Sequence, residues 1–194
     1  MLQTAIRPPE AAQLASNRRK ELTPERQHYL DELVVKSRLA AAAFYQFSQE
    51  QVDRCVRAMV LKGLEAAQEL AALAVTETKL GVFEDKVTKN RFAADTVHRF
   101  IRPMRTVGVV RRLEDRKILE IAEPFGVVAA IVPSTNPTST AIYKILIALK
   151  ARCPIVLSPH PSAARCITRV AEVMTEAAAA AGAPAGAINW MTTV

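Results

Sequence analysis

The spacing of apolar positions changes near residue 106. Between Arg26 and Phe100, apolar residues recur every three or four positions, which is the period of helices packed on one face. After Thr106 the apolar residues gather into short runs rich in valine and isoleucine, separated by further helical segments. The pattern therefore predicts one globular unit with a helical front half and an α/β back half.

Three helices are predicted in the front half. The first runs from Arg26 to Phe47, the second starts after a capping box formed by Ser48 and Gln51 and pauses at Gly63, and the third covers 84–100, ending before Pro103. Buried positions expected on the first and third helices are Leu30, Leu33, Val34 and Leu39, and Val87, Phe92, Ala94 and Val97, respectively.

The segment 106–121 predicts a β-hairpin. Two apolar runs flank the charged sequence Glu114-Asp115-Arg116-Lys117, which is a turn candidate. From the residues alone, this could be an ordinary surface hairpin.

The segment 120–161 predicts a right-handed βαβ unit around which the back half is organised. The runs 127–132 and 154–157 are typical of strands buried on both faces, and Thr138 or Ser139 is a candidate cap for the helix between them. Polar loops follow both strands, so they meet at the carboxyl edge of the sheet, where open α/β sheets bind ligands. A helix from Ser162 to Ala181 and a third strand at 187–191 complete the pattern.

Composition restricts the class of protein. The 194 residues suffice for one domain, with residues 1–27, which hold three prolines among charges, expected as a mobile tail before a folded part at 28–194. The net charge of +7 is scattered and aromatic residues make up only 5%, so nucleic-acid binding is the weaker interpretation and a phosphate-bearing cofactor fits at least as well. We expect no metal site, no membrane association and a cytoplasmic location, since no paired cysteine spacing, long apolar run or signal sequence is visible.

Several motifs in order resemble the acylating, CoA-dependent aldehyde dehydrogenases. They are 131–141 (IVPSTNPTSTA), 157–161 (LSPHP), 47–53 (FSQEQVD) and 81–90 (GVFEDKVTKN). The resemblance implies the N-terminal part of an aldehyde dehydrogenase fold: helices and a hairpin leading into an incomplete Rossmann-like parallel sheet. It also implies NAD as cofactor, CoA and an aldehyde as substrates, and a homo-oligomer assembled through the hairpin at 106–121.

The resemblance also implies roles for the two polar loops. Asn136 is the candidate oxyanion donor, although alignment on Pro137 and Lys144 favours Thr135; alternatively, both residues simply form a turn and cap the helix. The candidate cofactor-binding residues are Ile131, Val132, Pro133, Ser134, Thr135, Ser158, Pro159 and His160. Backbone N–H groups of the helix near Ser162, with Arg165 nearby, could bind phosphate. The motif at 84–90 reads only as a solvated, ion-paired face.

The family's nucleophilic cysteine has no counterpart here. Cys55 and Cys166 lie among apolar residues at helical spacing, and Cys153 precedes a strand at the end opposite the ligand loops. Family members are much longer, so the expected assignment is an N-terminal portion that is inactive alone. A non-catalytic nucleotide-binding or oligomerisation module is the alternative. The third strand is expected to present an unpaired edge that makes the chain marginally stable or prone to associate.

Overall fold

The computed structural model describes residues 22–192. The chain divides into two compact units, residues 1–31 and 32–194. Helix α2 spans Pro24–Tyr45, so it begins two residues before the predicted start. Most of the tail expected at 1–27 lies outside the described residues.

The front half of the second unit is helical, as predicted. Ser48 and Gln51 form the expected capping box, in which the Ser48 side chain accepts from the Gln51 N–H and Gln51 accepts from the Ser48 N–H. The helical segments that follow are α3 (Gln49–Glu65), α4 (Ala67–Thr78), α5 (Phe83–Arg91), the π-helix η1 (Phe92–Thr96) and α6 (Val97–Ile101).

The pause predicted at Gly63 is misplaced by a few residues. Helix α3 continues through Gly63 and ends at Glu65. A Cβ at position 63 would lie 2.9 Å from the Met174 Cε, so the glycine allows α3 to pack closely on the helix that carries Met174. The residue therefore serves packing between helices rather than chain reversal.

The third predicted helix is interrupted by the π-helix η1. The wider turn changes which side chains face inward: Ala93 and Ala94 are buried, whereas Phe92, a predicted core residue, is 59% exposed. Val87 and Ala94 are buried as predicted. Periodicity at 3.6 residues cannot reveal such a phase shift.

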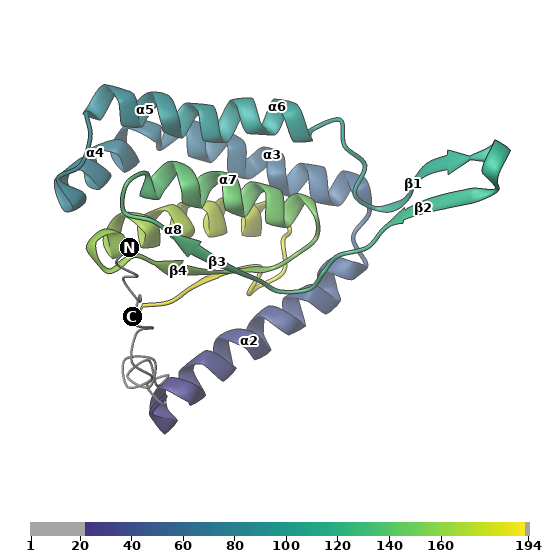
Figure 1. Cartoon of the computed structure of the whole chain (residues 1–194), viewed down its shortest axis with the longest axis horizontal. Helices are drawn as coiled ribbons and strands as arrows, with labels where there is room; N and C mark the ends of the chain where they lie inside the picture. Colours follow the sequence, from purple (N-terminus) through teal and green to yellow (C-terminus); the bar gives the residue numbers. More distant parts are fainter. Residues whose placement is uncertain (1–21, 193–194) are drawn as a thin grey trace, which may run out of the picture. The chain divides into compact units, whose positions relative to one another are not determined.

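The hairpin forms where it was predicted. Strand β1 (Gly108–Leu113) pairs antiparallel with β2 (Ile118–Ala122), and the turn holds a short 3₁₀ segment, Glu114–Arg116, followed by Lys117 with φ 53°. Figure 1 shows the hairpin extending away from the helices of the second unit. Ile118, Leu119 and Ile121 are each about half exposed, at 46%, 51% and 56%.

A three-stranded parallel sheet forms the back half, in the order β3-β4-β5. Its strands are β3 (Val128–Val132), β4 (Ile155–Pro159) and β5 (Ile188–Trp190), and its connecting helices are α7 (Pro137–Lys150) and α8 (Ala164–Ala180). Helices α3, α7 and α8 pack together beside the sheet (Figure 1). Their apolar side chains form one core cluster with Val132, Ile155 and Leu157.

Strand β3 is not buried on both faces, contrary to the prediction. Ala130 and Val132 are buried, but Ala129 is exposed and Ile131 is 78% exposed. Helices cover one face of β3, so the alternation expected for a half-covered sheet appears instead.

The buried face of α2 also differs from the predicted stripe. Ser37, Ala40 and Phe44 are buried, whereas Val34 and Leu39 are 37% and 69% exposed. Small residues face inward because the β5 segment approaches closely: the Asn189 Nδ2 donates to the Ser37 Oγ at 2.8 Å. The apolar stripe of α2 therefore does not mark its packed face, and the prediction of its buried positions was wrong in this respect.

In the described part of the chain, no helix is both long and apolar enough to cross a membrane.

Candidate functional site

The two polar loops meet at the carboxyl edge of the sheet, as predicted. The register places Ile131 beside Ser158 and Val132 beside Pro159, and the His160 N–H donates to the Val132 carbonyl at 3.0 Å. Pro133, Thr135 and His160 are exposed, while Ser134 and Ser158 are partly buried. The candidate residues of both loops are therefore neighbours at the sheet edge.

Asn136 occupies the N-cap position of α7, but its side chain does not cap the helix. Its Oδ1 faces two lysines of α5 instead, with the Lys89 Nζ at 3.2 Å and the Lys86 Nζ at 3.5 Å. An ammonium group can only donate, so the oxygen of the amide must face the lysines. The Asn136 NH₂ group consequently points elsewhere and has no hydrogen-bond acceptor among residues 22–192.

Lys86 anchors the same loop a second time. Its Nζ donates to the Thr135 carbonyl, and the side chain is only 4% exposed. A Cβ at position 81 would lie 2.8 Å from the Lys86 Cε, so Gly81 leaves room for the lysine stem. Burial lowers the pKa of Lys86, and the nearby charge of Lys89 lowers it further.

Asn90 completes this contact between α5 and the loop. Its Oδ1 accepts from the Thr138 hydroxyl at 2.7 Å, and its Nδ2 donates to the Ala67 carbonyl at 3.0 Å. Thr138 therefore does not cap α7, and the helix begins at Pro137 rather than after Thr138 or Ser139. The motif at 84–90, read from sequence as a solvated face, instead holds the 133–138 loop through Lys86, Lys89 and Asn90.

The second loop presents a hydroxyl and an imidazole. The His160 Nδ1 accepts from the Ser162 N–H at 3.2 Å and lies 2.9 Å from the Ser162 Oγ, which fixes the ring on its own loop. The Ser158 hydroxyl, one residue before the end of β4, has no partner in the described part of the chain. It remains available to a ligand hydroxyl.

The start of α8 does not present free N–H groups to a phosphate, contrary to the expectation. The helix begins at Ala164, and the N–H groups of Arg165 and Cys166 donate to the Glu77 carboxylate at 2.9 and 2.7 Å. A carboxylate favours this position because of the helix dipole. Glu77 lies 88 residues before Arg165 in sequence, so no local pattern could have indicated the pairing.

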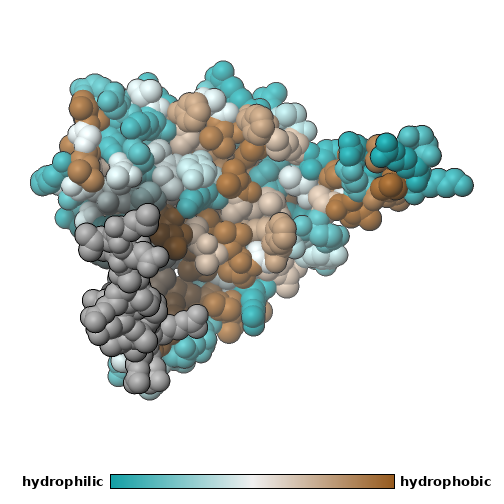
Figure 2. Space-filling model, viewed as in Figure 1, coloured by the Kyte–Doolittle hydropathy of each residue, from teal (hydrophilic) through white to brown (hydrophobic). Residues whose placement is uncertain are grey.

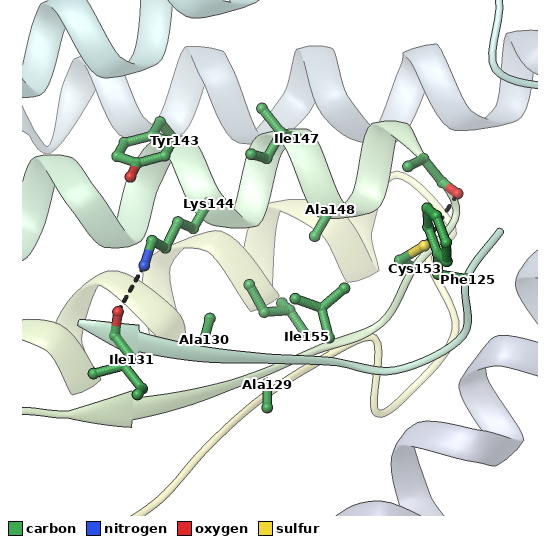
Figure 3. A pocket seen from close by; sticks show the side chains of 12 residues that line it. Phe125, Ala129, Ala130, Ile131, Tyr143, Lys144, Ile147, Ala148, Cys153 and Ile155 are labelled. Carbon is green, nitrogen blue, oxygen red and sulfur yellow. Dashed lines mark hydrogen bonds between the residues drawn. The ribbon is translucent and has the colours of Figure 1, made fainter.

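An apolar groove of about 590 Å³ lies between the free edge of β3 and α7 (Figure 3). Its lining includes Phe125, Ile131, Tyr143 and Ile147. The Lys144 Nζ donates to the Ile131 carbonyl at 2.6 Å, so one of the outward-facing carbonyls of the edge already has a donor. The groove could not be predicted from the sequence because it depends on which strand forms the edge of the sheet.

Comparison with known proteins agrees with this architecture. The profile of the aldehyde dehydrogenase family matches residues 20–194. The chain belongs to the aldehyde dehydrogenase family. Among its relatives, the bifunctional aldehyde-alcohol dehydrogenase AdhE of Escherichia coli K12 is 43% identical over 162 residues, and the acetylating succinate-semialdehyde dehydrogenase of Clostridium kluyveri is 35% identical over 160. These alignments cover 84% and 82% of this chain, but only 18% and 35% of the relatives.

Solved aldehyde dehydrogenases show the same fold. The acetylating enzyme of Geobacillus thermoglucosidasius aligns with a TM-score of 0.84 and 46% identity, covering 86% of this chain and 37% of that one. The propionaldehyde dehydrogenase of Rhodopseudomonas palustris, solved with bound propionyl-CoA, aligns with a TM-score of 0.71 and 28% identity, covering 83% and 35%. The chain thus spans little more than a third of these enzymes.

An aldehyde dehydrogenase of this type needs a reactive thiol, and the three cysteines here are buried. Burial raises the pKa of Cys55, and burial together with the Glu77 carboxylate raises the pKa of Cys166 to about 12. The Cys153 thiol donates to the Ala151 carbonyl beside the apolar groove (Figure 3). A thiol is nucleophilic only as thiolate, so Cys55 and Cys166 have the packing role predicted for them.

Proposed function

We propose that this chain is the N-terminal portion of an NAD-dependent acylating aldehyde dehydrogenase. The complete enzyme would oxidise an aldehyde with NAD and transfer the acyl group to CoA, giving an acyl-CoA and NADH. The acylating relatives and the two converging loops support this assignment. The observation that carries it is the orientation of Asn136.

In the proposed reaction, the aldehyde oxygen gains negative charge as a thiolate attacks the carbonyl carbon. A preorganised amide N–H near that oxygen stabilises the charge. The Asn136 NH₂ group is suited to this task because Lys86 and Lys89 hold its oxygen on the other side. The same contacts would keep the amide from rotating when the substrate enters.

For the cofactor, the residues fit a ribose better than a phosphate. NAD, when bound, accepts the hydride that leaves the carbon under attack. The Ser158 hydroxyl is available for a ribose hydroxyl, and His160, two residues later, is exposed on the same loop. Glu77 occupies the N–H groups at the start of α8, so the phosphates of the cofactor would have to lie elsewhere.

We further propose that the hairpin β1–β2 contributes to a homo-oligomer. Its apolar residues Ile118, Leu119 and Ile121 are half exposed in the single chain. Burying them against a second subunit would be favourable by roughly 25 cal/mol for each Å² removed from water.

Calorimetric titration of the purified chain with NAD tests the proposed cofactor site. Ser158→Ala should weaken NAD binding about tenfold, the effect of one lost hydrogen bond of about 1.4 kcal/mol. Thr88→Ala, which removes an exposed hydroxyl on α5, should leave the affinity unchanged. Equal affinities for the Ser158 variant and the unmodified chain would contradict the placement of the ribose.

A turnover assay separates binding from chemistry. With acetaldehyde, CoA and NAD, the chain alone should form no NADH above the rate without protein, because its thiols are buried. NADH formation that disappears after alkylation of the chain would refute the proposed inactivity and require a nucleophile among Cys55, Cys153 and Cys166.

A further inference from the structure

A second polar pocket lies at the end of α7 remote from the candidate site. It has a volume of about 370 Å³ and is formed by α3, α6 and the last turn of α7. Its lining residues are Asp53, Val56, Arg57, His98, Arg102 and Lys150. Helix α7 starts at the Asn136 loop and ends at Lys150. The pocket therefore lies at the amino ends of the strands, away from the two polar loops, and belongs to a different site.

One of the groups that line the pocket is the buried ammonium of Lys150. Lys150 is 3% exposed, and its Nζ donates to the Asp53 Oδ1 at 2.5 Å and to the Arg102 carbonyl at 3.3 Å. An ammonium has three N–H groups, so one donor of Lys150 remains unused within the described residues. Unused donors on a buried charge are unfavourable unless a ligand or water accepts from them.

Asp53 compensates only part of the positive charge. Its Oδ1 accepts from Lys150 and from the Gln49 amide at 3.1 Å, so the carboxylate is already engaged. The guanidinium groups of Arg57 and Arg102 have no acidic partner in the part of the chain that the structure describes. Two guanidinium groups and one ammonium therefore share a pocket with a single carboxylate.

We propose that this pocket binds a small phosphate-bearing anion. Planar guanidinium groups match the oxygen geometry of phosphate, and a buried ammonium adds a point charge beneath it. The volume exceeds that of inorganic phosphate, so a phosphate monoester fits the space. The proposal is independent of the aldehyde chemistry, since no residue of the two polar loops takes part.

The state of His98 supports this assignment. Burial lowers the pKa of its imidazole, and Arg102 and Lys150 lower it further, whereas Asp95 and Asp53 act in the other direction. Asp95 is paired with Arg99 at 2.6 Å. The neutral ring is a hydrogen-bond donor for an anion, and a bound anion would raise the pKa of His98 by opposing the charges of Arg57, Arg102 and Lys150.

The test is an NMR titration of the chain with inorganic phosphate at constant ionic strength. The chain has three histidines, His28, His98 and His160, so each imidazole signal can be followed separately. We expect saturable shifts of the His98 signal and a higher His98 pKa with phosphate, while His28 and His160 serve as internal references. Shifts that do not saturate, or that affect the three rings equally, would overturn the proposal.

A charge-matched pair of variants adds a second criterion. Arg57→Gln combined with Arg102→Gln should weaken phosphate binding at least tenfold. Arg38→Gln combined with Arg91→Gln removes the same net charge from exposed helix positions outside the pocket and should retain the affinity. Equal weakening in both double variants would show general electrostatic attraction and refute a specific site. Lys150 is left intact because it is buried and ion-paired with Asp53, so its replacement would itself destabilise the fold.

Discussion

The residue that links most of the candidate site is Lys86. It is nearly inaccessible to solvent, yet its ammonium holds the backbone of Thr135 and lies within reach of the Asn136 amide oxygen. A buried lysine without an acidic partner is costly unless backbone or side-chain oxygens receive its protons. The loop oxygens supply that compensation, so loop geometry and lysine burial depend on each other.

This dependence predicts a pH effect on stability. The pKa of Lys86 is lowered in the folded chain, so near the ordinary value of 10.5 the unfolded chain binds more protons than the folded one. Lys86 should therefore contribute a rise in the free energy of unfolding with pH as the ordinary pKa is approached, by about 1.4 kcal/mol for each unit of pKa difference. Cys55 and Cys166, whose pKa values are raised, oppose this rise above pH 9, so the contribution of Lys86 is measured as the difference between variants.

Urea unfolding between pH 8 and pH 10.5 measures this effect. Lys86→Met should lose this contribution, whereas Lys62→Met, which removes a partly exposed ammonium paired with Glu65, should retain it. Parallel pH profiles for the unmodified chain and Lys86→Met would contradict the argument. An additional signal is the Asn136 side-chain amide in NMR spectra, which should shift in Lys86→Met but not in Lys62→Met.

At the scale of elements, Glu77 joins α4 to α8. Its carboxylate accepts from the N–H groups of Arg165 and Cys166, where the helix dipole favours negative charge. Glu77→Gln keeps the shape but removes the charge, and should lower the free energy of unfolding by about 1 to 2 kcal/mol. Cys166 is buried, so its alkylation requires opening of the fold and should become faster in the variant because the variant is less stable.

Denaturant titration and thiol labelling check both parts of this prediction. Glu176→Gln is the control, because Glu176 is an exposed residue within α8. Equal stability of the two variants would mean that the Glu77 contact contributes little to the attachment of α8.

The segment before β5 contacts α2 at Gly186, so replacing this glycine with alanine should lower the stability of the fold. Gly186 has φ +85°, and a Cβ there would lie 2.7 Å from the Lys36 carbonyl oxygen. Gly182 has a similar φ of +96°, but a Cβ there would meet nothing within 4 Å. Both Ala variants bear left-handed strain of about 1 to 2 kcal/mol, and only Gly186→Ala adds a clash of about 1 to 3 kcal/mol.

Thermal unfolding of the two variants separates strain from clash. Gly186→Ala should melt at a clearly lower temperature than Gly182→Ala. Similar melting temperatures would show that α2 can move away from the β5 segment at little cost.

These elements also show what could be predicted from sequence. Local signals were sufficient for the Ser48 capping box, the hairpin turn at 114–117 and the βαβ unit, since each is encoded within a few residues. The contacts of Lys89 with Asn136, of Glu77 with α8 and of Asn189 with Ser37 join residues 47, 89 and 152 positions apart. Such contacts depend on how elements pack, so the positions of the loops were predicted and their supports were not.

At the scale of the whole chain, two strands of the parallel sheet have a free edge. β4 lies in the centre, so β5 is an edge strand as predicted, and β3 is the other edge in the described residues. The β3 edge is the more apolar surface: Phe125 is fully exposed, Ile131 is 78% exposed, and the groove beside α7 adds Ile147. Apolar surface is visible in Figure 2 over the region where Figure 1 shows β3. We therefore expect association through the β3 edge in addition to the edge predicted at the third strand.

We expect the isolated chain to form dimers or larger species by pairing β3 with β3 of a second copy. Val128 and Val132 bond to β4, so by alternation the N–H and C=O groups of Ala129 and Ile131 face outward. Of these groups, only the Ile131 carbonyl has a partner within residues 22–192, the Lys144 Nζ. A two-fold axis would let the unpaired N–H and C=O groups of the two edges bond to each other and would bury both apolar grooves.

Ile131→Lys places a charge on that edge and should shift the chain toward monomer in sedimentation velocity experiments. Leu39→Lys, a charge added at a similarly exposed apolar position on α2, should leave the distribution unchanged. A monomeric unmodified chain at ordinary concentrations, with a sharp unfolding transition, would show that the β3 edge is tolerated in water and that this sheet is stable with both edges open.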